Sequence, residues 1–289
     1  MGIYLSQDQI NNFHRDGFLI IPNYLDDDEI ATLRLKAEKM VNDFDVSQVS
    51  VFSTVDQTKT SDQYFIDSGD KIRCFFEEES FDQDGQLIQD KMYAINKIGH
   101  ALHDLDDDFH KASYKKELAG IARDIGMKNP LMVQSQYIFK QPKIGGKVVA
   151  HQDNTFIYTD PPSCMGFWMA LEDATVENGC LQGIPGSHGD GDVQRRFLRN
   201  QQGDGVLFQG ESREWDLSRM VPLEAKNRSL VLLDGACVHM SAENRSPHSR
   251  HAYIIHAVDA TNDQWPVDNW LQRPPEMPFK HLNEEVGFK

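Results

Sequence analysis

A chain of 289 residues, of which 39% are hydrophobic and 26% are charged, has the composition of an ordinary soluble globular protein. Folding at this length buries roughly three quarters of the unfolded surface, so we expect stability without disulfide bonds. The formal net charge of −16 excludes a nucleic acid or an anionic membrane as the expected partner, because both require a basic surface.

Cysteine usage and the lack of targeting signals indicate an intracellular protein. The four cysteines form no CxxC pair, which argues against a zinc finger or a disulfide framework: Cys74, Cys164, Cys180 and Cys237. This pattern is typical of a reducing compartment, and we expect a cytoplasmic location. We find no apolar run of membrane-spanning length and no secretory leader. Without internal repeats or long linkers, we expect one domain over residues 1–289 and a monomer.

The N-terminal elements begin with clear start signals. Ser6 and Gln9 have the spacing of a capping box, and Gly17 supplies the stop for a short helix. Residues 18–21 are all apolar and predict a short buried strand. A second capping box begins at Asp26 and precedes a longer stretch with apolar residues at helical spacing.

The middle of the chain is expected to be helical. Segment 43–64 is polar, and we expect a long surface excursion there. Residues 85–126 place apolar side chains in two helical stripes, and Gly126 is a suitable C-terminal cap. Lys97 falls within this segment and is therefore expected on a helix. Together, residues 1–130 are predicted to form a mainly helical support.

After residue 130 the apolar pattern changes to two-residue alternation, which indicates strands. Eight candidate strands are expected: 131–139, 147–153, 164–172, 179–184, 204–209, 219–224, 229–234 and 250–258. Many short strands preceded by helices predict an α+β fold that is mainly β. The core, residues 131–258, is expected to be a jelly roll (a double-stranded β-helix or cupin-like barrel), with N-terminal helices beside it. Residues 187–203 are expected to be a mobile loop, and 259–289 a C-terminal tail.

A His-x-Asp pair marks a candidate metal site. His151 and Asp153 lie two residues apart in a predicted strand, so their side chains point to the same face of the sheet. Such a pair alone is a weak signal. His239 follows the apolar strand 229–234 and can meet the pair across a barrel. Two imidazoles and one carboxylate leave three positions of a metal open, an arrangement that suits Fe(II) and dioxygen chemistry.

Arg250, eleven residues after His239, adds a fourth component. A guanidinium binds a carboxylate through two parallel hydrogen bonds. Arg250 is therefore a candidate anchor for the far carboxylate of 2-oxoglutarate, whose keto-acid end would bind the iron. We assign His151, Asp153 and His239 as metal ligands, and these three with Arg250 as the catalytic set.

These residues and several longer stretches resemble the phytanoyl-CoA dioxygenase family. The matching stretches are collinear over nearly the whole chain: DGFLIIP (16–22), SGDKIRCFFE (68–77), INKIGHALH (95–103), QSQYIFKQP (134–142), HQD (151–153), LEDATVENGCL (171–181), IPGSH (184–188), and the distal His239 with Arg250. The resemblance implies an Fe(II)- and 2-oxoglutarate-dependent oxygenase. It also implies contacts to 2-oxoglutarate from Lys97, Gln136, Trp168, Ser241 and Arg250. Gln136 departs from the family's pattern, which has methionine at that position.

The family's reaction implies hydroxylation of a substrate carbon while 2-oxoglutarate and O2 give succinate and carbon dioxide, with ascorbate as an optional reductant. Asp153 fills the coordination position that halogenating relatives leave open for chloride, which favours hydroxylation. The substrate is expected to be a small molecule or an acyl-CoA thioester. A basic cluster on segment 187–203 is a candidate contact for CoA phosphates: Arg195, Arg196 and Arg199.

Two alternatives remain open at this point. The same ligand set can hold zinc or manganese in a hydrolase or isomerase on a cupin-like barrel, and such an enzyme does not need Arg250. A sensor that binds 2-oxoglutarate without turnover would keep every residue and release no succinate. Weaker metal candidates are His100, His103 and His188, whereas His256 is expected beside the ligands, on the strand face of Arg250.

Overall fold

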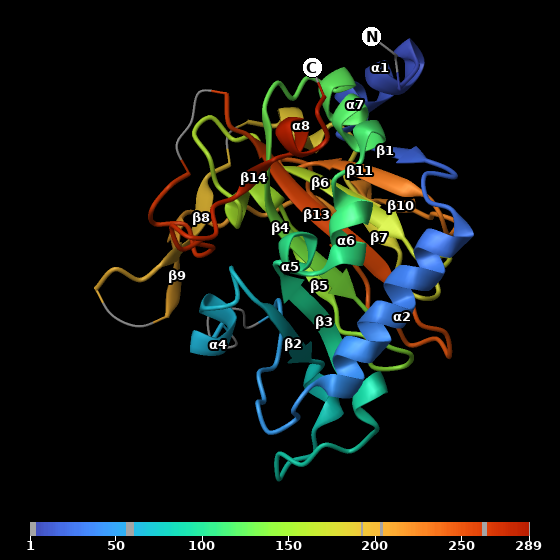
Figure 1. The fold of residues 1–289 in the computed structure, drawn as a ribbon, viewed down its shortest axis with the longest axis vertical. Helices are drawn as coiled ribbons and strands as arrows, with labels where there is room; N and C mark the ends of the chain where they lie inside the picture. The colour runs from blue at the N-terminus through green and yellow to red at the C-terminus, as the bar shows by residue number, and fades with distance from the viewer. Residues whose placement is uncertain (1–3, 56–60, 192, 203–204, 262–264, 289) are drawn as a thin grey trace.

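The computed structural model describes residues 4–55, 61–191, 193–202, 205–261 and 265–288 (Figure 1). Two antiparallel sheets face each other, and helices cover the outer face of the larger one. This is the expected jelly-roll fold with a helical layer. Within the described residues, no helix is both long and apolar enough to cross a membrane.

The α-helices of the described residues are mostly short, and all except α8 precede the jelly roll in the chain. They are α1 (Gln7–Asp16), α2 (Asp27–Asp43), α4 (Gln63–Ile66), α5 (Leu102–Leu105), α6 (Asp107–Ser113), α7 (Lys116–Asp124) and α8 (Leu282–Glu285). Both predicted capping boxes are present, with the side chains of Ser6 and Asp26 accepting hydrogen bonds from the backbone N–H three residues later. Helices α2, α6 and α7 lie on one side of the larger sheet (Figure 1).

The strands form a major sheet, a minor sheet and a separate hairpin. In chain order they are β1 (Phe18–Ile21), β2 (Ile72–Phe76), β3 (Ile95–His100), β4 (Pro130–Ile138), β5 (Val148–His151), β6 (Met165–Ala170), β7 (Leu181–Gly183), β8 (Arg195–Arg199), β9 (Val206–Gly210), β10 (Val221–Leu223), β11 (Leu230–Asp234), β12 (His239–Ser241), β13 (Ala252–Asp259) and β14 (Lys280–His281). The major sheet has the order β1-β11-β6-β13-β4-β3-β2, with β14 also paired to β4. The minor sheet has the order β10-β7-β12-β5, and β8 pairs with β9.

The two sheets stay separate over the described residues and do not close into a barrel. The central strands alternate as predicted. Phe167 and Met169 on β6 join the core under the helices, whereas Trp168 and Ala170 point between the sheets. Each face of the major sheet therefore packs against a different layer, and the inner face is available for a site.

The helical prediction for residues 85–126 is wrong in its first half. Residues 95–100 form β3, which pairs with β2 and β4 in the major sheet. The apolar residues Ile95 and Ile98 have helical spacing, and the buried Lys97 hides the alternation of a strand. The mobile loop expected at 187–203 is also wrong in part, because residues 195–199 form β8 and pair with β9. The expected excursion at 43–64 contains α4, and residues 56–60 lie outside the described part of the chain.

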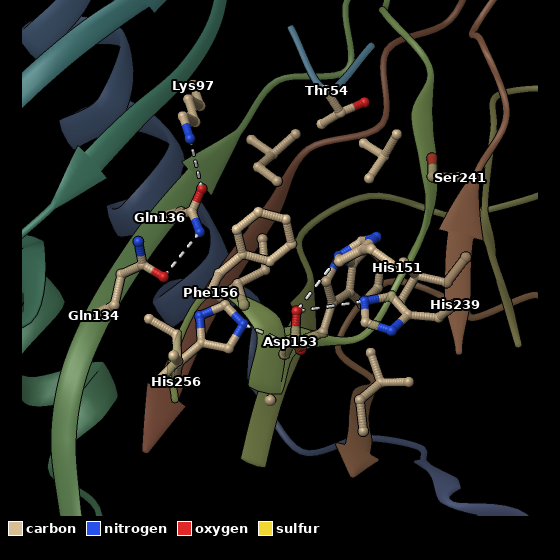
Figure 2. Close-up of a pocket in the computed structure, with 18 of the residues that line it drawn as sticks. Thr54, Lys97, Gln134, Gln136, His151, Asp153, Phe156, His239, Ser241 and His256 are labelled. Carbon is tan, nitrogen blue, oxygen red and sulfur yellow. Dashed lines mark hydrogen bonds and ion pairs between the residues drawn. The ribbon is translucent and has the colours of Figure 1, made fainter. Parts of the chain in front are cut away.

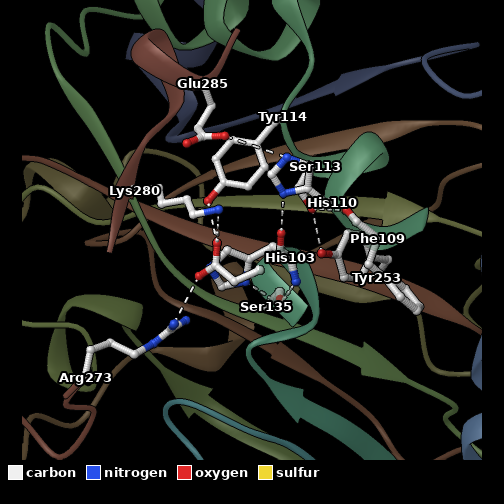
Figure 3. Close-up of polar contacts among 11 residues, drawn as sticks. His103, Phe109, His110, Ser113, Tyr114, Ser135, Tyr253, Arg273, Lys280 and Glu285 are labelled. Carbon is white, nitrogen blue, oxygen red and sulfur yellow. Dashed lines mark hydrogen bonds and ion pairs between the residues drawn. The ribbon is translucent and has the colours of Figure 1, made fainter. Parts of the chain in front are cut away.

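The segment after residue 259 packs against the sheet through a buried polar cluster on the helical side (Figure 3). Arg273 Nη1 lies 3.0 Å from Asp104 Oδ2, and both side chains are 2% exposed. The Tyr114 hydroxyl donates to Asp104 Oδ1 at 3.0 Å, and His103 Nδ1 lies 2.7 Å from Ser135 Oγ on β4. A buried ion pair held by further hydrogen bonds fixes this segment to α5 and β4.

Candidate metal and co-substrate site

The three predicted metal ligands meet between the two sheets (Figure 2). Strands β5 and β12 pair antiparallel with His151 opposite His239, which brings the imidazoles side by side with ring centroids 4.3 Å apart. Asp153 Oδ1 lies 3.4 Å from His151 Nε2 and 3.6 Å from His239 Nε2. Strand β5 ends at His151, and Asp153 begins a 3-10 turn rather than continuing the strand as predicted. One ligand atom from each residue lies within 4.8 Å of the others.

Backbone carbonyls fix the orientation of both imidazoles. His151 Nδ1 lies 2.8 Å from the Val149 carbonyl oxygen, and His239 Nδ1 lies 3.0 Å from that of Cys237. A carbonyl only accepts, so each Nδ1 carries the proton and each Nε2 presents a lone pair toward Asp153. This is the tautomer that a metal-binding imidazole needs.

The electrostatics of the site favour the metal-binding protonation states. Burial lowers the pKa of His239 to about 4, so the imidazole is neutral near pH 7. Burial alone would raise the pKa of Asp153, but the neighbouring histidines hold it well below the usual value. A carboxylate with two neutral imidazoles is the protonation state that binds a divalent cation.

All eight predicted site residues line one cavity of about 150 Å³ between the sheets: Lys97, Gln136, His151, Asp153, Trp168, His239, Ser241 and Arg250. Trp168 lies on the inner face of β6, as its predicted strand position requires. Ser241, at the end of β12, donates its hydroxyl to the Gly179 carbonyl at 2.9 Å. Five strands, the turn at Asp153 and the segment just before β13 thus contribute side chains to one cavity.

Arg250 is a buried cation whose donors are unused. Its side chain is among the largest that are fully buried, and its Nε and Nη1 atoms have no hydrogen-bond partner among the described residues. The guanidinium carbon lies 5.2 Å from the centre of the Trp168 ring. Burial lowers the pKa of Arg250 to about 10, which leaves it charged near pH 7. A charged, buried guanidinium with free donors can bind an incoming carboxylate through two hydrogen bonds.

Lys97 is a second buried basic side chain in the cavity, and it lies on β3 rather than on the expected helix. Its Nζ donates to Gln136 Oε1 at 3.1 Å and lies 3.4 Å from the centre of the Phe52 ring. Gln136 Nε2 donates in turn to Gln134 Oε1 at 3.3 Å (Figure 2). Burial lowers the pKa of Lys97 well below its usual value. The described residues place no carboxylate within ion-pair distance of it, so its neighbours are an amide and aromatic rings.

Sequence reasoning missed the apolar half of the cavity. Phe52, Phe65, Phe156 and Trp270 line it, and they come from segments outside the major and minor sheets. Phe65 and Trp270 stack with ring centroids 4.5 Å apart, although they are far apart in the sequence. No local pattern signals such a wall. Gln134, by contrast, lies two residues before Gln136 on β4, and strand alternation would have identified it.

A larger outer chamber, of about 600 Å³, adjoins the cavity and shares His151 and Phe156 with it. The hairpin of β8 and β9 forms one wall. Arg195 lines this chamber with its guanidinium carbon 3.6 Å from the centre of the Phe208 ring. The other two arginines of the predicted cluster have structural contacts. Arg196 pairs with Asp268 at 2.8 Å, and Arg199 donates to two backbone carbonyls.

The weaker metal candidates lie outside the ligand group. His100 Nδ1 is 2.6 Å from Ser68 Oγ, and His103 belongs to the polar cluster of Figure 3. His188 Nε2 is 3.0 Å from the His14 carbonyl oxygen. His256 lies next to the ligands, as expected, with Nε2 3.4 Å from Asp153 Oδ2.

The chain is similar to known proteins over nearly their full length. The family model described as Phytanoyl-CoA dioxygenase (PhyH) matches residues 13–252. "Phytanoyl-CoA dioxygenase" of Arabidopsis thaliana is 47% identical, over 93% of this chain and 94% of its own. "Phytanoyl-CoA dioxygenase domain-containing protein 1" of Mus musculus is 42% identical, over 96% of this chain and 98% of its own.

Solved structures of lower identity share the fold. EctD from S. alaskensis, solved with 2-oxoglutarate and 5-hydroxyectoine, matches with a TM-score of 0.62 at 19% identity, covering 94% of this chain and 82% of its own. The epimerase SnoN, solved with Fe3+ and alpha ketoglutarate, matches with a TM-score of 0.62 at 14% identity, covering 96% and 98%.

The family match and the fold define the class of protein: the chain is a dioxygenase of the 2-oxoglutarate-dependent kind. Within that class it belongs to the phytanoyl-CoA dioxygenase family.

Proposed function

We propose that the protein binds Fe(II) and 2-oxoglutarate in the inner cavity and hydroxylates a small organic substrate, with release of succinate and carbon dioxide. The observation that carries this proposal is the pairing of two features in one cavity. A facial set of two imidazoles and a carboxylate lies beside a buried arginine that has unused donors. The first suits Fe(II), and the second suits a dicarboxylic co-substrate.

The residues fit the absent groups in their chemistry. His151, Asp153 and His239 would hold the iron, because each presents a lone pair to the same point. Arg250 would bind the far carboxylate of 2-oxoglutarate with Nε and Nη1. The remaining predicted contacts line the same cavity and complete the co-substrate site: Lys97, Gln136, Trp168 and Ser241.

The chemistry divides between cofactor and chain. When bound, the iron would couple O2 reduction to decarboxylation of 2-oxoglutarate and so supply the oxidant. The chain orients the co-substrate through Arg250 and keeps bulk water from the reacting centre. Phe156, Ile157 and Leu233 give the cavity apolar walls for this purpose.

The substrate is proposed to enter through the outer chamber. 2-Oxoglutarate occupies much of a cavity of about 150 Å³, whereas the adjoining chamber of about 600 Å³ has room for a larger molecule. Both small metabolites and acyl-CoA thioesters remain within this proposal. Of the three arginines predicted to contact CoA phosphates, Arg195 lines the chamber and would be the contact for a CoA thioester. The chain's net charge of −16 gives no general attraction for CoA phosphates.

Succinate formation tests the proposal directly. Purified protein is incubated with Fe(II), ascorbate and 2-oxoglutarate, beside Asp153→Ala and Arg250→Ala. Arg245→Ala is the matched control, because Arg245 is half exposed and pairs with Glu79 and Glu243 at the surface. We expect succinate from the wild type and the control, and none above background from the two site variants. Uncoupled turnover without substrate is enough for this readout.

The other outcomes separate the alternatives. Stabilisation by 2-oxoglutarate without succinate, even with a panel of acyl-CoAs and small metabolites, would favour a sensor. If 2-oxoglutarate gives neither succinate nor stabilisation, the oxygenase proposal is refuted and a non-redox metal enzyme is favoured.

The proposed cytoplasmic location is supported by four free and buried cysteines. The monomeric state stays a prediction, which light scattering during gel filtration would test.

A further inference from the structure

The two carboxylate oxygens of Asp153 face different neighbours. Oδ1 faces the two imidazoles, at 3.4 Å from His151 Nε2 and 3.6 Å from His239 Nε2. Oδ2 turns away from them and lies 3.4 Å from Nε2 of His256 on β13 (Figure 2). One oxygen is therefore directed to the ligand group, and the other is directed to a third imidazole.

A glycine makes this arrangement possible. Gly166 on β6 pairs directly with His256 on β13, so a side chain at 166 would stand beside the imidazole on the same face. A Cβ at this position would lie 3.3 Å from Asp153 Oδ2, closer than ordinary van der Waals contact. The missing side chain leaves a notch in the inner face of the sheet, and the carboxylate reaches His256 through it.

His256 is held in place as a donor. Its side chain is 9% exposed, and its Nδ1 atom is buried without a hydrogen-bond partner among the described residues. A neutral imidazole carries one proton, and the carboxylate is an acceptor only. The proton therefore belongs on Nε2, where it meets Oδ2. The contact, at 3.4 Å, is longer than a strong hydrogen bond.

We propose that His256 is a positioning residue: by binding Oδ2, it keeps that oxygen from the metal and makes Asp153 a one-oxygen ligand through Oδ1. This inference rests on the proposed function. A carboxylate that binds through both oxygens takes two coordination positions, and one that binds through Oδ1 takes one. The notch and His256 together preserve the open positions that the co-substrate and O2 require.

Metal titration of paired variants tests the role of His256. Co(II) is titrated anaerobically into the metal-free protein without 2-oxoglutarate, and its visible absorption is recorded. In His256→Gln the amide nitrogen takes the place of Nε2 and still reaches Oδ2. In His256→Asn it takes the place of Nδ1 and does not. His110→Gln and His110→Asn are the matched control pair, because His110 lies in the half-exposed contact with Glu285.

We expect His256→Gln to keep a Co(II) dissociation constant near that of the wild type, and His256→Asn to weaken binding by about 10–100-fold. The absorption band of the Asn variant should change in shape and intensity, since Oδ2 is released to the metal. Gly166→Ala leaves His256 unaltered and closes the notch, so the same direction of change is expected there. It also decides the question if a His256 variant fails to fold.

Wild-type affinity and spectra in His256→Asn and Gly166→Ala would overturn the inference. Equal, large losses in His256→Gln and His256→Asn would also overturn it, because His256 would then be a ligand itself. The proposed function fails separately. If the wild type binds no Co(II), or binds it equally well in Asp153→Ala, the metal site is absent and the role of His256 does not arise.

Discussion

Replacing Arg250 with methionine tests the co-substrate anchor, because opposite effects are expected with and without ligand. Burial lowers the pKa of Arg250 from 12.5 to about 10, so the folded state disfavours the charged guanidinium. At about 1.36 kcal/mol per pKa unit, this penalty is about 3 kcal/mol. It is fully present at neutral pH and fades only as the pH rises through about 10. Methionine removes it, so the free energy of unfolding of the ligand-free protein should rise by about 1–3 kcal/mol.

Binding of 2-oxoglutarate should stabilise the wild type far more than Arg250→Met. Nε and Nη1 of Arg250 can each donate a charge-assisted hydrogen bond worth about 1.5–3 kcal/mol. Losing both weakens 2-oxoglutarate binding by roughly 10²–10⁴-fold, since each 1.4 kcal/mol is about tenfold. Arg250→Lys keeps the charge and loses the two-bond geometry, so its effect on the KM for 2-oxoglutarate should fall between the wild type and Arg250→Met.

Thermal unfolding measures both effects in one experiment. Melting is followed with Mn(II) alone and with Mn(II) plus 2-oxoglutarate. At a ligand concentration of about 100 times Kd, the wild type gains about 2.7 kcal/mol. At roughly 2–4 °C per kcal/mol this is a clear rise in Tm, and Arg250→Met should show none. Without 2-oxoglutarate, however, Arg250→Met should melt above the wild type.

Arg245→Met is the control for loss of a guanidinium. Arg245 forms exposed ion pairs with Glu79 and Glu243, which contribute about 0–1 kcal/mol. Its replacement should lower stability slightly and leave the response to 2-oxoglutarate intact. A ligand-free Arg250→Met protein that melts below the wild type would refute the reasoning, because it would mean that the guanidinium is already well partnered.

Four further predictions concern other buried polar groups and the metal. Lys97→Met removes a buried cation and should raise the unfolding free energy of the ligand-free protein by about 1–3 kcal/mol in denaturant titration, while raising the KM for 2-oxoglutarate in the succinate assay. Asp104→Ala leaves Arg273 buried without its carboxylate and should cost about 3–5 kcal/mol, with an unchanged Co(II) dissociation constant. Burial lowers the pKa of His103 from 6.5 to about 4, so stability is full above pH 6.5 and lost as the pH falls toward 4. His103→Gln should flatten the slope of unfolding free energy in that window by up to about 1.36 kcal/mol per pH unit. Chelation with EDTA should abolish succinate formation; Fe(II) should restore it and Zn(II) should not.

The jelly-roll core could be predicted from the sequence because its strands alternate cleanly. Each of the eight candidate strands after residue 130 overlaps a strand of the structure. The meeting of His151 and His239 was expected, but through the end of strand 229–234. That strand, β11, lies in the major sheet, and the short β12, which was not predicted, pairs His239 with His151 on β5. Whether two sheets close into a barrel depends on the pairing of their edge strands, which no local pattern records.

Two other predictions were wrong because tertiary contacts outweigh the local sequence pattern. A lysine in the interior of a strand is normally expected to face solvent, yet Lys97 is 2% exposed and lies over the Phe52 ring. This one residue turned a buried strand into an apparent helix. The expected loop at 187–203 failed for a related reason. Glycines and arginines in this segment suggested a solvated loop, whereas β8 packs Phe197 against Phe208, and Arg196 and Arg199 contact residues 268 and 270.

The hairpin of β8 and β9 has a consequence for how the substrate range can change. It forms its own two-stranded sheet, while the proposed ligands His151 and His239 lie on strands of the minor sheet. It meets the site through aromatic packing of Phe156 on Phe197 and Phe208. Residues 195–210 could be exchanged for the hairpin of another family member with Phe197 and Phe208 kept. This exchange would not alter the residues proposed to bind iron. Under the proposed function, exchange of this hairpin would change the substrate range and leave the proposed metal ligands in place.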